Sequence, residues 1–263
     1  MLKVLFFGDV YGRPGRRALK KAVPKLKKHY DTDIVIANVE NAAHGVGITK
    51  KTLAELMDAG IDFATSGNHI FNRKDGIELL NEKDPVLIRP ANYPPGAPGV
   101  GYKIIPIRTQ KLLVVNVMGR VFMKEDLDCP FRAMDTILDE VGSDIKNIVV
   151  DFHAEVTSEM IALGMYLDGR VSAVFGTHTH VPTQDFKILP GGTAYVTDVG
   201  MVGPTNSVLG VDKDIILRRY LTQMSESMEV ADSPQAEVNA VYFEIDSKGK
   251  ASKIEKIYEV YDV

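Results

Sequence analysis

Short apolar runs of strand length alternate, in the first part of the chain, with segments whose apolar residues recur at helical spacing. Residues 2–7, 34–39 and 61–65 are the apolar runs, and each is typical of a strand buried on both faces. Residues 16–30 and 50–59 carry apolar side chains three and four positions apart, the spacing of one face of a helix. The order strand, helix, strand, helix, strand predicts parallel βαβ construction.

Glycine and proline mark the limits of these elements. Gly12-Arg-Pro-Gly15 predicts a turn before the first helix, and Pro24 predicts a kink within that helix. Prolines and glycines between residues 84 and 101 predict a long irregular connection. The remaining predicted elements are a hairpin of 102–107 and 111–117, a strand at 147–152, a helix at 157–167, strands at 171–175 and 192–196, and a closing antiparallel hairpin of 236–245 and 251–260. No repeat or long linker divides the chain, so we expect one α/β domain, residues 1–263.

Polar residues stand at the carboxyl ends of five predicted strands. In open α/β sheets this edge is where ligand sites form, because it brings residues distant in sequence to one rim. These residues offer two carboxylates, two amide oxygens and three imidazoles, a mixed set of seven donors that suits two transition-metal ions. The absence of thiolates argues against a structural zinc site. The candidate ligands are Asp9, Glu40, Asn41, Asn68, His153, His178 and His180, and His69 lies beside them.

Taken singly, most of these residues have an ordinary structural explanation. Asp9 could cap a turn, Asn41 and Asn68 could be turn residues, and His153 could be a hydrogen-bonded core histidine. Glu40 is harder to explain in this way, because it ends an apolar strand, where an unpaired carboxylate is costly to bury. The joint pattern therefore favours a metal site.

His178 and His180 form an H-x-H pair directly after the apolar run at 171–175. Residues two apart on an extended segment point the same way, so we expect this segment to be extended and both imidazoles to face one site. Pro182 disfavours an immediate helix.

The charge and composition of the chain limit the kinds of partner that we expect. The net charge of −4 gives no overall basic field, so we expect no stable complex with nucleic acid and favour a small-molecule substrate. A single cysteine suits a reducing compartment. The N-terminal apolar run is too short for a signal peptide, and no stretch approaches the ~18 apolar residues of a membrane span. We expect a cytoplasmic protein, and the sequence leaves a homo-oligomer open.

Four ordered blocks carry a family resemblance. Gly8-Asp9, Ser66-Gly-Asn-His69, the strand-end His153 and Gly176-Thr-His-Thr-His180 resemble the calcineurin-like metallophosphoesterases. Three departures resemble the bacterial YmdB subfamily in particular: Tyr11 replaces the usual first-block histidine, Asn38-Val-Glu-Asn41 replaces the second block, and Ile70 follows His69. The matching stretches are residues 8–16, 38–49 and 66–72.

The resemblance implies a calcineurin-like four-layer α/β/β/α sandwich of two mixed sheets flanked by helices. It implies a phosphodiesterase that hydrolyses 2′,3′- or 3′,5′-cyclic nucleotides or related phosphodiesters, with two metal ions, iron or manganese foremost and zinc as a further choice, activating a bridging water. Tyr11 is expected only to pack or to form a hydrogen bond. The implied roles are Asp9, Asn41 and His180 as ligands of one ion, Asn68, His153 and His178 as ligands of the other, Glu40 as the bridge, and His69 as the acid.

Two other functions remain open at this level. A metal-dependent amidohydrolase uses similar ligands, but its H-x-H pair follows the first strand of a barrel. A nucleotide-sensing regulatory protein would retain the same site and turn over slowly. The glycine-rich stretch of residues 200–210 could contact substrate, although ordinary turns are the better explanation.

Overall fold

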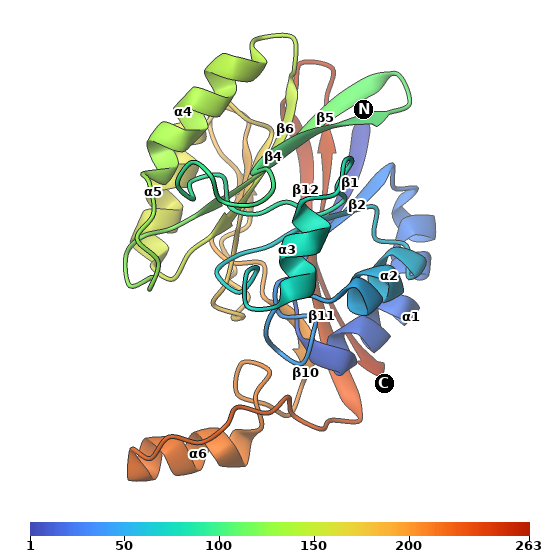
Figure 1. Ribbon diagram of the computed structural model, residues 1–263. Coiled ribbons are helices and arrows are strands. Elements are labelled where there is room, and N and C mark those ends of the chain that lie inside the picture. The colour runs from blue at the N-terminus through green and yellow to red at the C-terminus, as the bar shows by residue number, and fades with distance from the viewer.

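The computed structural model describes residues 1–263 and arranges them in four layers, with helices on the outer face of each of two packed sheets (Figure 1). Helices α1 (Gly12–Tyr30), α2 (Lys50–Asp58) and α3 (Lys74–Leu80) pack on one sheet. Helices α4 (Pro130–Val141) and α5 (Thr157–Leu167) pack on the other. The predicted four-layer α/β/β/α sandwich is confirmed.

The first sheet, sheet A, has the strand order β12-β11-β10-β1-β2-β3. Strands β10, β1, β2 and β3 run parallel, whereas β11 is antiparallel to both β1 and β10. The strand bounds are β1 (Leu2–Val10), β2 (Ile34–Asn38), β3 (Phe63–Thr65), β10 (Met201–Pro204), β11 (Gln235–Ile245) and β12 (Ala251–Asp262).

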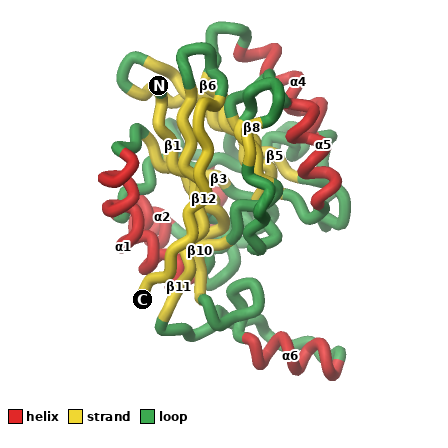
Figure 2. The backbone as a smooth tube through the Cα atoms, turned by 180° about the vertical axis from the view of Figure 1, so that it is seen from behind, coloured by secondary structure: helices red, strands yellow, loops and turns green.

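The second sheet, sheet B, has the order β4-β5-β6-β7-β9-β8, with a parallel centre and an antiparallel strand at each edge. Both sheets are therefore mixed and open, as Figure 2 shows from behind, and neither closes into a barrel. The amidohydrolase alternative is wrong for this reason. The strand bounds are β4 (Tyr102–Ile107), β5 (Gln110–Met118), β6 (Asn147–His153), β7 (Ala173–Thr177), β8 (Lys187–Ile188) and β9 (Ala194–Val196).

Successive side chains of the central strands point to opposite faces of the sheet, so they belong alternately to two hydrophobic cores. In β1, Leu5 and Phe7 pack under α1 and α2, whereas Val4 and Phe6 point between the sheets. Phe6 there meets Phe175 of β7, with ring centroids 5.4 Å apart. Burial on both faces explains why these strands appear in the sequence as continuous apolar runs.

Several local predictions need correction. Gly12-Arg-Pro-Gly15 is the first turn of α1 rather than a separate turn; Pro14 is tolerated there because the amide that it lacks would have no partner in the helix. Gly203 lies in β10 rather than in a loop. Helices α3 and α4 and strand β8 were not predicted.

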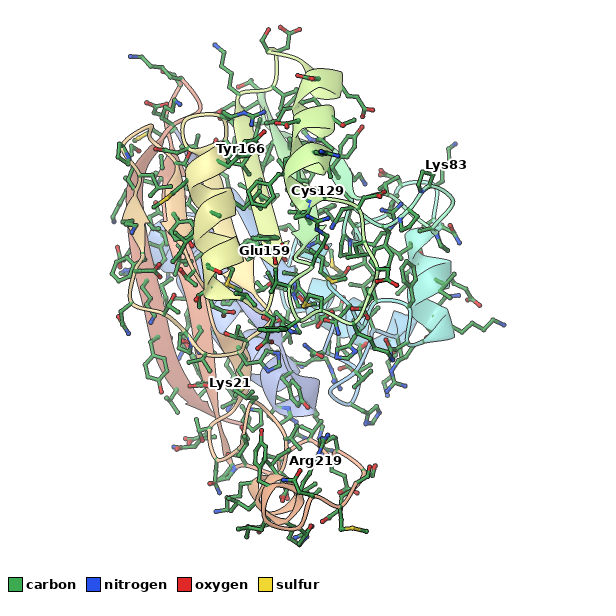
Figure 3. All side chains as sticks on the ribbon, turned by 90° about the vertical axis from the view of Figure 1, so that its left-hand side faces the viewer. Lys21, Lys83, Cys129, Glu159, Tyr166 and Arg219 are labelled. Atoms are coloured by element: carbon green, nitrogen blue, oxygen red, sulfur yellow. The ribbon has the colours of Figure 1, made fainter.

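Helix α6 (Lys213–Thr222) was not predicted either, and it projects from the body of the molecule in both views (Figures 1 and 2). Ile216 is its single buried residue, and Arg219 marks the helix at the lower end of Figure 3. None of the helices is long and apolar enough to cross a membrane.

Gly176 allows β7 to approach the segment that follows β9. A Cβ at this position would overlap the carbonyl oxygen of Thr197, which belongs to rigid backbone. We expect Gly176→Ala to lower the free energy of unfolding by about 3 kcal/mol or more, measured by urea denaturation. Gly142→Ala is the control: nothing lies within 4 Å of its Cβ, so only its positive φ of 67° should cost stability, by about 1 kcal/mol. Equal losses would contradict the steric explanation.

Candidate metal centre

The strand ends of both sheets meet at one edge, and the sequence-predicted polar residues lie there. Glu40 and Asn41 follow β2, and Asn68 follows β3, all in sheet A. From sheet B come His153, the last residue of β6, and His178 and His180 after β7. Asp9 is the penultimate residue of β1. The structure therefore brings all seven residues to one place, four from sheet A and three from sheet B.

Asp9, Asn41 and His180 form one group. His180 Nδ1 lies 2.9 Å from the carbonyl oxygen of Leu209, which accepts its proton, so the lone pair of Nε2 faces the site. That Nε2 is 3.2 Å from Asn41 Nδ2 and 3.9 Å from Asp9 Oδ1. The ring of Tyr11 stands edge-on to His180, with centroids 5.4 Å apart, so the expectation that Tyr11 packs is confirmed.

Asn68, His153 and His178 form the second group, which is centred on the Nε2 atom of His153. His153 Nε2 lies 3.0 Å from Asn68 Oδ1 and 3.0 Å from His178 Nδ1. His178 Nε2 points outward to Glu155, at 3.1 Å.

Glu40 lies between the two groups and is fully buried. Its Oε1 accepts from Asn41 Nδ2 at 3.2 Å and lies 3.1 Å from His153 Nε2. Its Oε2 accepts the backbone amide of His69 at 2.9 Å. A single carboxylate thus touches one member of each group.

The ionisation of this cluster is set by burial and by close charges. Burial alone would raise the pKa of Glu40, but His153 and His69 beside it bring that pKa down to about 2. Burial opposes the charge on His153, yet Glu40 and Asp9 raise its pKa to about 9. Burial raises the pKa of Asp9 well above its usual value, and burial together with His153 lowers the pKa of His178 to about 3. The protein alone therefore stabilises the buried carboxylate of Glu40 with a proton on His153.

The segment that carries His178 and His180 is not extended, and the prediction on this point is wrong. Both residues have positive φ, 104° and 65°, which is strained for side chains other than glycine. Asp198 holds the strained segment, because its Oδ2 accepts the amide and the hydroxyl of Thr179, at 3.0 and 2.8 Å. The two imidazoles therefore converge through left-handed backbone and not through strand alternation.

Three observations fit these donors to metal ions. Asp9 Oδ1 is buried and has no hydrogen-bond partner, an arrangement that costs free energy unless a cation compensates it. One ligating atom each of Glu40, His153 and His178 lie within 4.8 Å of one another. At Gly67 a Cβ would overlap the ring of His153 and the carboxylate of Glu40, so glycine keeps the space between them open.

The buried residues that orient these donors were not predicted from the sequence. Asp151 is fully buried between the sheets and accepts hydrogen bonds from Asn38 Nδ2 at 3.0 Å, from Thr177 Oγ1 at 2.7 Å and from Thr65 Oγ1. Since Thr177 donates to Asp151, its oxygen accepts the Nδ1 proton of His153 at 2.9 Å. His153 is thereby fixed with Nε2 toward Glu40. A charged residue inside the apolar run Val149-Val-Asp-Phe152 was the available signal.

Comparisons with known proteins agree with what the geometry of the site indicates. A Bacillus subtilis protein named 2′,3′-cyclic-nucleotide 2′-phosphodiesterase is 45% identical over 97% of this chain and 96% of its own. The crystal structure of a novel phosphatase from Mycoplasma pneumoniae matches with a TM-score of 0.93 at 38% identity, over 99% of this chain and 94% of that one. A candidate 5′-nucleotidase from Staphylococcus aureus shares the fold alone, with a TM-score of 0.61 at 14% identity over 100% of this chain and 54% of that one.

Two open mixed sheets with this polar edge define the calcineurin-like metallophosphoesterase fold. Within that class, the chain belongs to the family described as YmdB-like protein, whose model matches residues 5–257.

The hydroxyl of Thr177 is the link between Asp151 and His153. We expect Thr177→Val to lower the free energy of unfolding of the metal-free protein by about 1–3 kcal/mol, because it leaves a buried carboxylate oxygen and an imidazole N–H without partners. Thr136→Val in α4 is the control: its exposed hydroxyl also donates a hydrogen bond, to the Arg132 carbonyl at 3.1 Å, and its loss should change stability by less than about 0.5 kcal/mol. Urea denaturation of both variants measures the difference, and equal effects would remove Thr177 from the buried network.

Proposed function

We propose that this protein is a metal-dependent phosphodiesterase that hydrolyses cyclic nucleotides, with 2′,3′-cyclic nucleotides first and 3′,5′-cyclic nucleotides second. The observation that carries the proposal is the position of Glu40, a buried carboxylate between two groups of N and O donors. The name of the Bacillus subtilis relative supports the choice of 2′,3′-cyclic nucleotides.

The residues would hold two ions. Asp9, Asn41 and His180 would take one, Asn68, His153 and His178 the other, and Glu40 would touch both. Imidazoles with carboxylate and amide oxygens suit iron, manganese or zinc better than calcium. Ions bound there would lower the pKa of water and offset the charge of the phosphoryl oxygens.

The side chains of the protein supply orientation and a proton. His69 is half-buried, and its backbone amide is fixed by Glu40, while its ring lies 3.5 Å from Asn68 Nδ2. It lines a cleft of about 290 Å³ together with Asn68 and His178. An imidazole at this position would donate a proton to the leaving oxygen of the substrate, a step that typically contributes ~10² to 10⁴-fold.

Removal of the charge of Glu40 tests the proposal. We expect the wild-type protein, saturated with manganese or iron, to bind close to two ions per chain and to hydrolyse cyclic nucleotides. Glu40→Gln should remain folded, lose turnover at least ~100-fold and bind fewer ions, because an amide cannot offset two cations. Elemental analysis and a product assay on the same samples measure both effects.

Two results would contradict this proposal. A plateau at one ion in the wild-type protein would remove the bridging role of Glu40. Full metal content with negligible turnover on every cyclic nucleotide and model phosphodiester would instead favour the nucleotide-sensing alternative.

His69 and His178 should differ in what they do. We expect His69→Ala to keep its metal and lose activity on cyclic nucleotides, whose alkoxide leaving group needs a proton. The loss should be smaller on bis(p-nitrophenyl) phosphate, whose leaving group is a good one. His178→Ala should lose both metal and activity on both substrates.

His29→Ala, which changes a histidine near the end of α1, is the matched control and should behave as wild type. The measurement is kcat with bound metal for each variant. Metal loss in His69→Ala as large as that in His178→Ala would make His69 a ligand and remove it as the proton donor.

A further inference from the structure

Phe122 is an aromatic side chain that contributes nothing to any core. It is 87% exposed, whereas the next most exposed phenylalanine, Phe186, is 36% exposed. Its φ of +61° places it in the left-handed region, which a bulky residue adopts only when its surroundings impose it. An exposed ring held in strained backbone gains no packing in return, and such positions are concentrated at functional sites.

The loop that carries Phe122 is tied to the metal centre on one side and to α5 on the other. The amide of Gly119 donates to the carbonyl oxygen of His153 at 2.9 Å. The carboxylate of Glu159, labelled in Figure 3, accepts the amides of Arg120 at 3.0 Å and Val121 at 3.2 Å. The bonds to Gly119, Arg120 and Val121 fix the backbone just before Phe122.

Phe122 lines the same cleft as the candidate catalytic residues. The cleft of about 290 Å³ is lined by Asn68, His69, Asn72, His178 and residues 122–125. One part of the cleft therefore carries the candidate ligands Asn68 and His178 together with His69, and the other part carries the aromatic ring of Phe122.

We propose that Phe122 is the platform on which the nucleobase of the substrate stacks, while metal ions bound by the donors around Glu40 would hold its phosphate. This inference rests on the proposed function. A phenyl ring has no hydrogen-bonding group, so the platform accepts all bases and favours purines through their larger stacking surface.

Substrates with and without a base test the platform. The probes are 2′,3′-cyclic AMP and ribose 2′,3′-cyclic phosphate, which offers the same phosphodiester without a base. We expect Phe122→Ala to lower kcat/KM for 2′,3′-cyclic AMP by about 5- to 100-fold, mainly through KM, because stacking on an aromatic side chain supplies that much binding. The base-free substrate should be unaffected, and Phe122→Trp should retain activity on both.

Val121→Ala is the matched control, since Val121 is 44% exposed on the same loop but does not line the cleft. It should match the wild type on both substrates, and its backbone bond to Glu159 is retained. Equal loss on the base-free substrate in Phe122→Ala would overturn the proposal and make Phe122 a support of the loop. No loss on either substrate would overturn it as well.

A binding measurement separates this inference from the proposed function. Calorimetry compares the affinity of metal-loaded wild type and Phe122→Ala for AMP and for ribose 5-phosphate, with no turnover required. A preference for AMP that falls about 5- to 100-fold in the variant supports the platform even if hydrolysis is absent. An unchanged preference overturns it even if the enzyme hydrolyses cyclic nucleotides.

Discussion

The carboxylate of Asp151 is buried between the two sheets, where an unpaired charge would cost several kcal/mol. Side chains from both sheets satisfy it, so the sheets are held in one alignment at the edge where their parallel strands end. Four of the candidate ligands follow members of this network by one to three residues. The pairs are Asn38 and Glu40, Thr65 and Asn68, Asp151 and His153, and Thr177 and His178. Misalignment of the sheets would therefore both expose a buried charge and disperse the site.

The site combines charge with backbone strain. Glu40 and His153 stabilise each other's charged forms in a fully buried place, while Asp9 retains an acceptor without a partner. His178 and His180 sit in left-handed backbone that Asp198 holds through Thr179. The strained backbone and the unpartnered oxygen of Asp9 cost stability, and cations bound by these donors would offset that cost. The metal-free protein is accordingly expected to be the less stable form.

Local patterns in the sequence were enough to predict the strand-end placement of all seven donors, because apolar runs define buried strands and parallel strands share an edge. They were not enough for the H-x-H segment, whose conformation depends on Asp198, many residues later and in another loop. Helix α4 begins with Pro130 and has apolar residues at helical spacing, so its signal was present and overlooked. Phe122 gave no local signal, since its exposure and positive φ arise from contacts of its loop with β6 and α5.

Strand β1 lies in the middle of sheet A and pairs along much of its length with β11, from Leu2 opposite Ile245 to Phe7 opposite Ala240. During synthesis on the ribosome, β1 must therefore wait for β11, which is translated much later. Asp9 belongs to that strand, and its neighbours β10 and β11 are absent until residues 201–245 have been translated. A nascent chain that ends at His180 contains every candidate ligand but not β10 and β11, the strands that pair with β1. Metal loading is thus expected to follow translation, and fragments that lack the last hairpin should not assemble the centre.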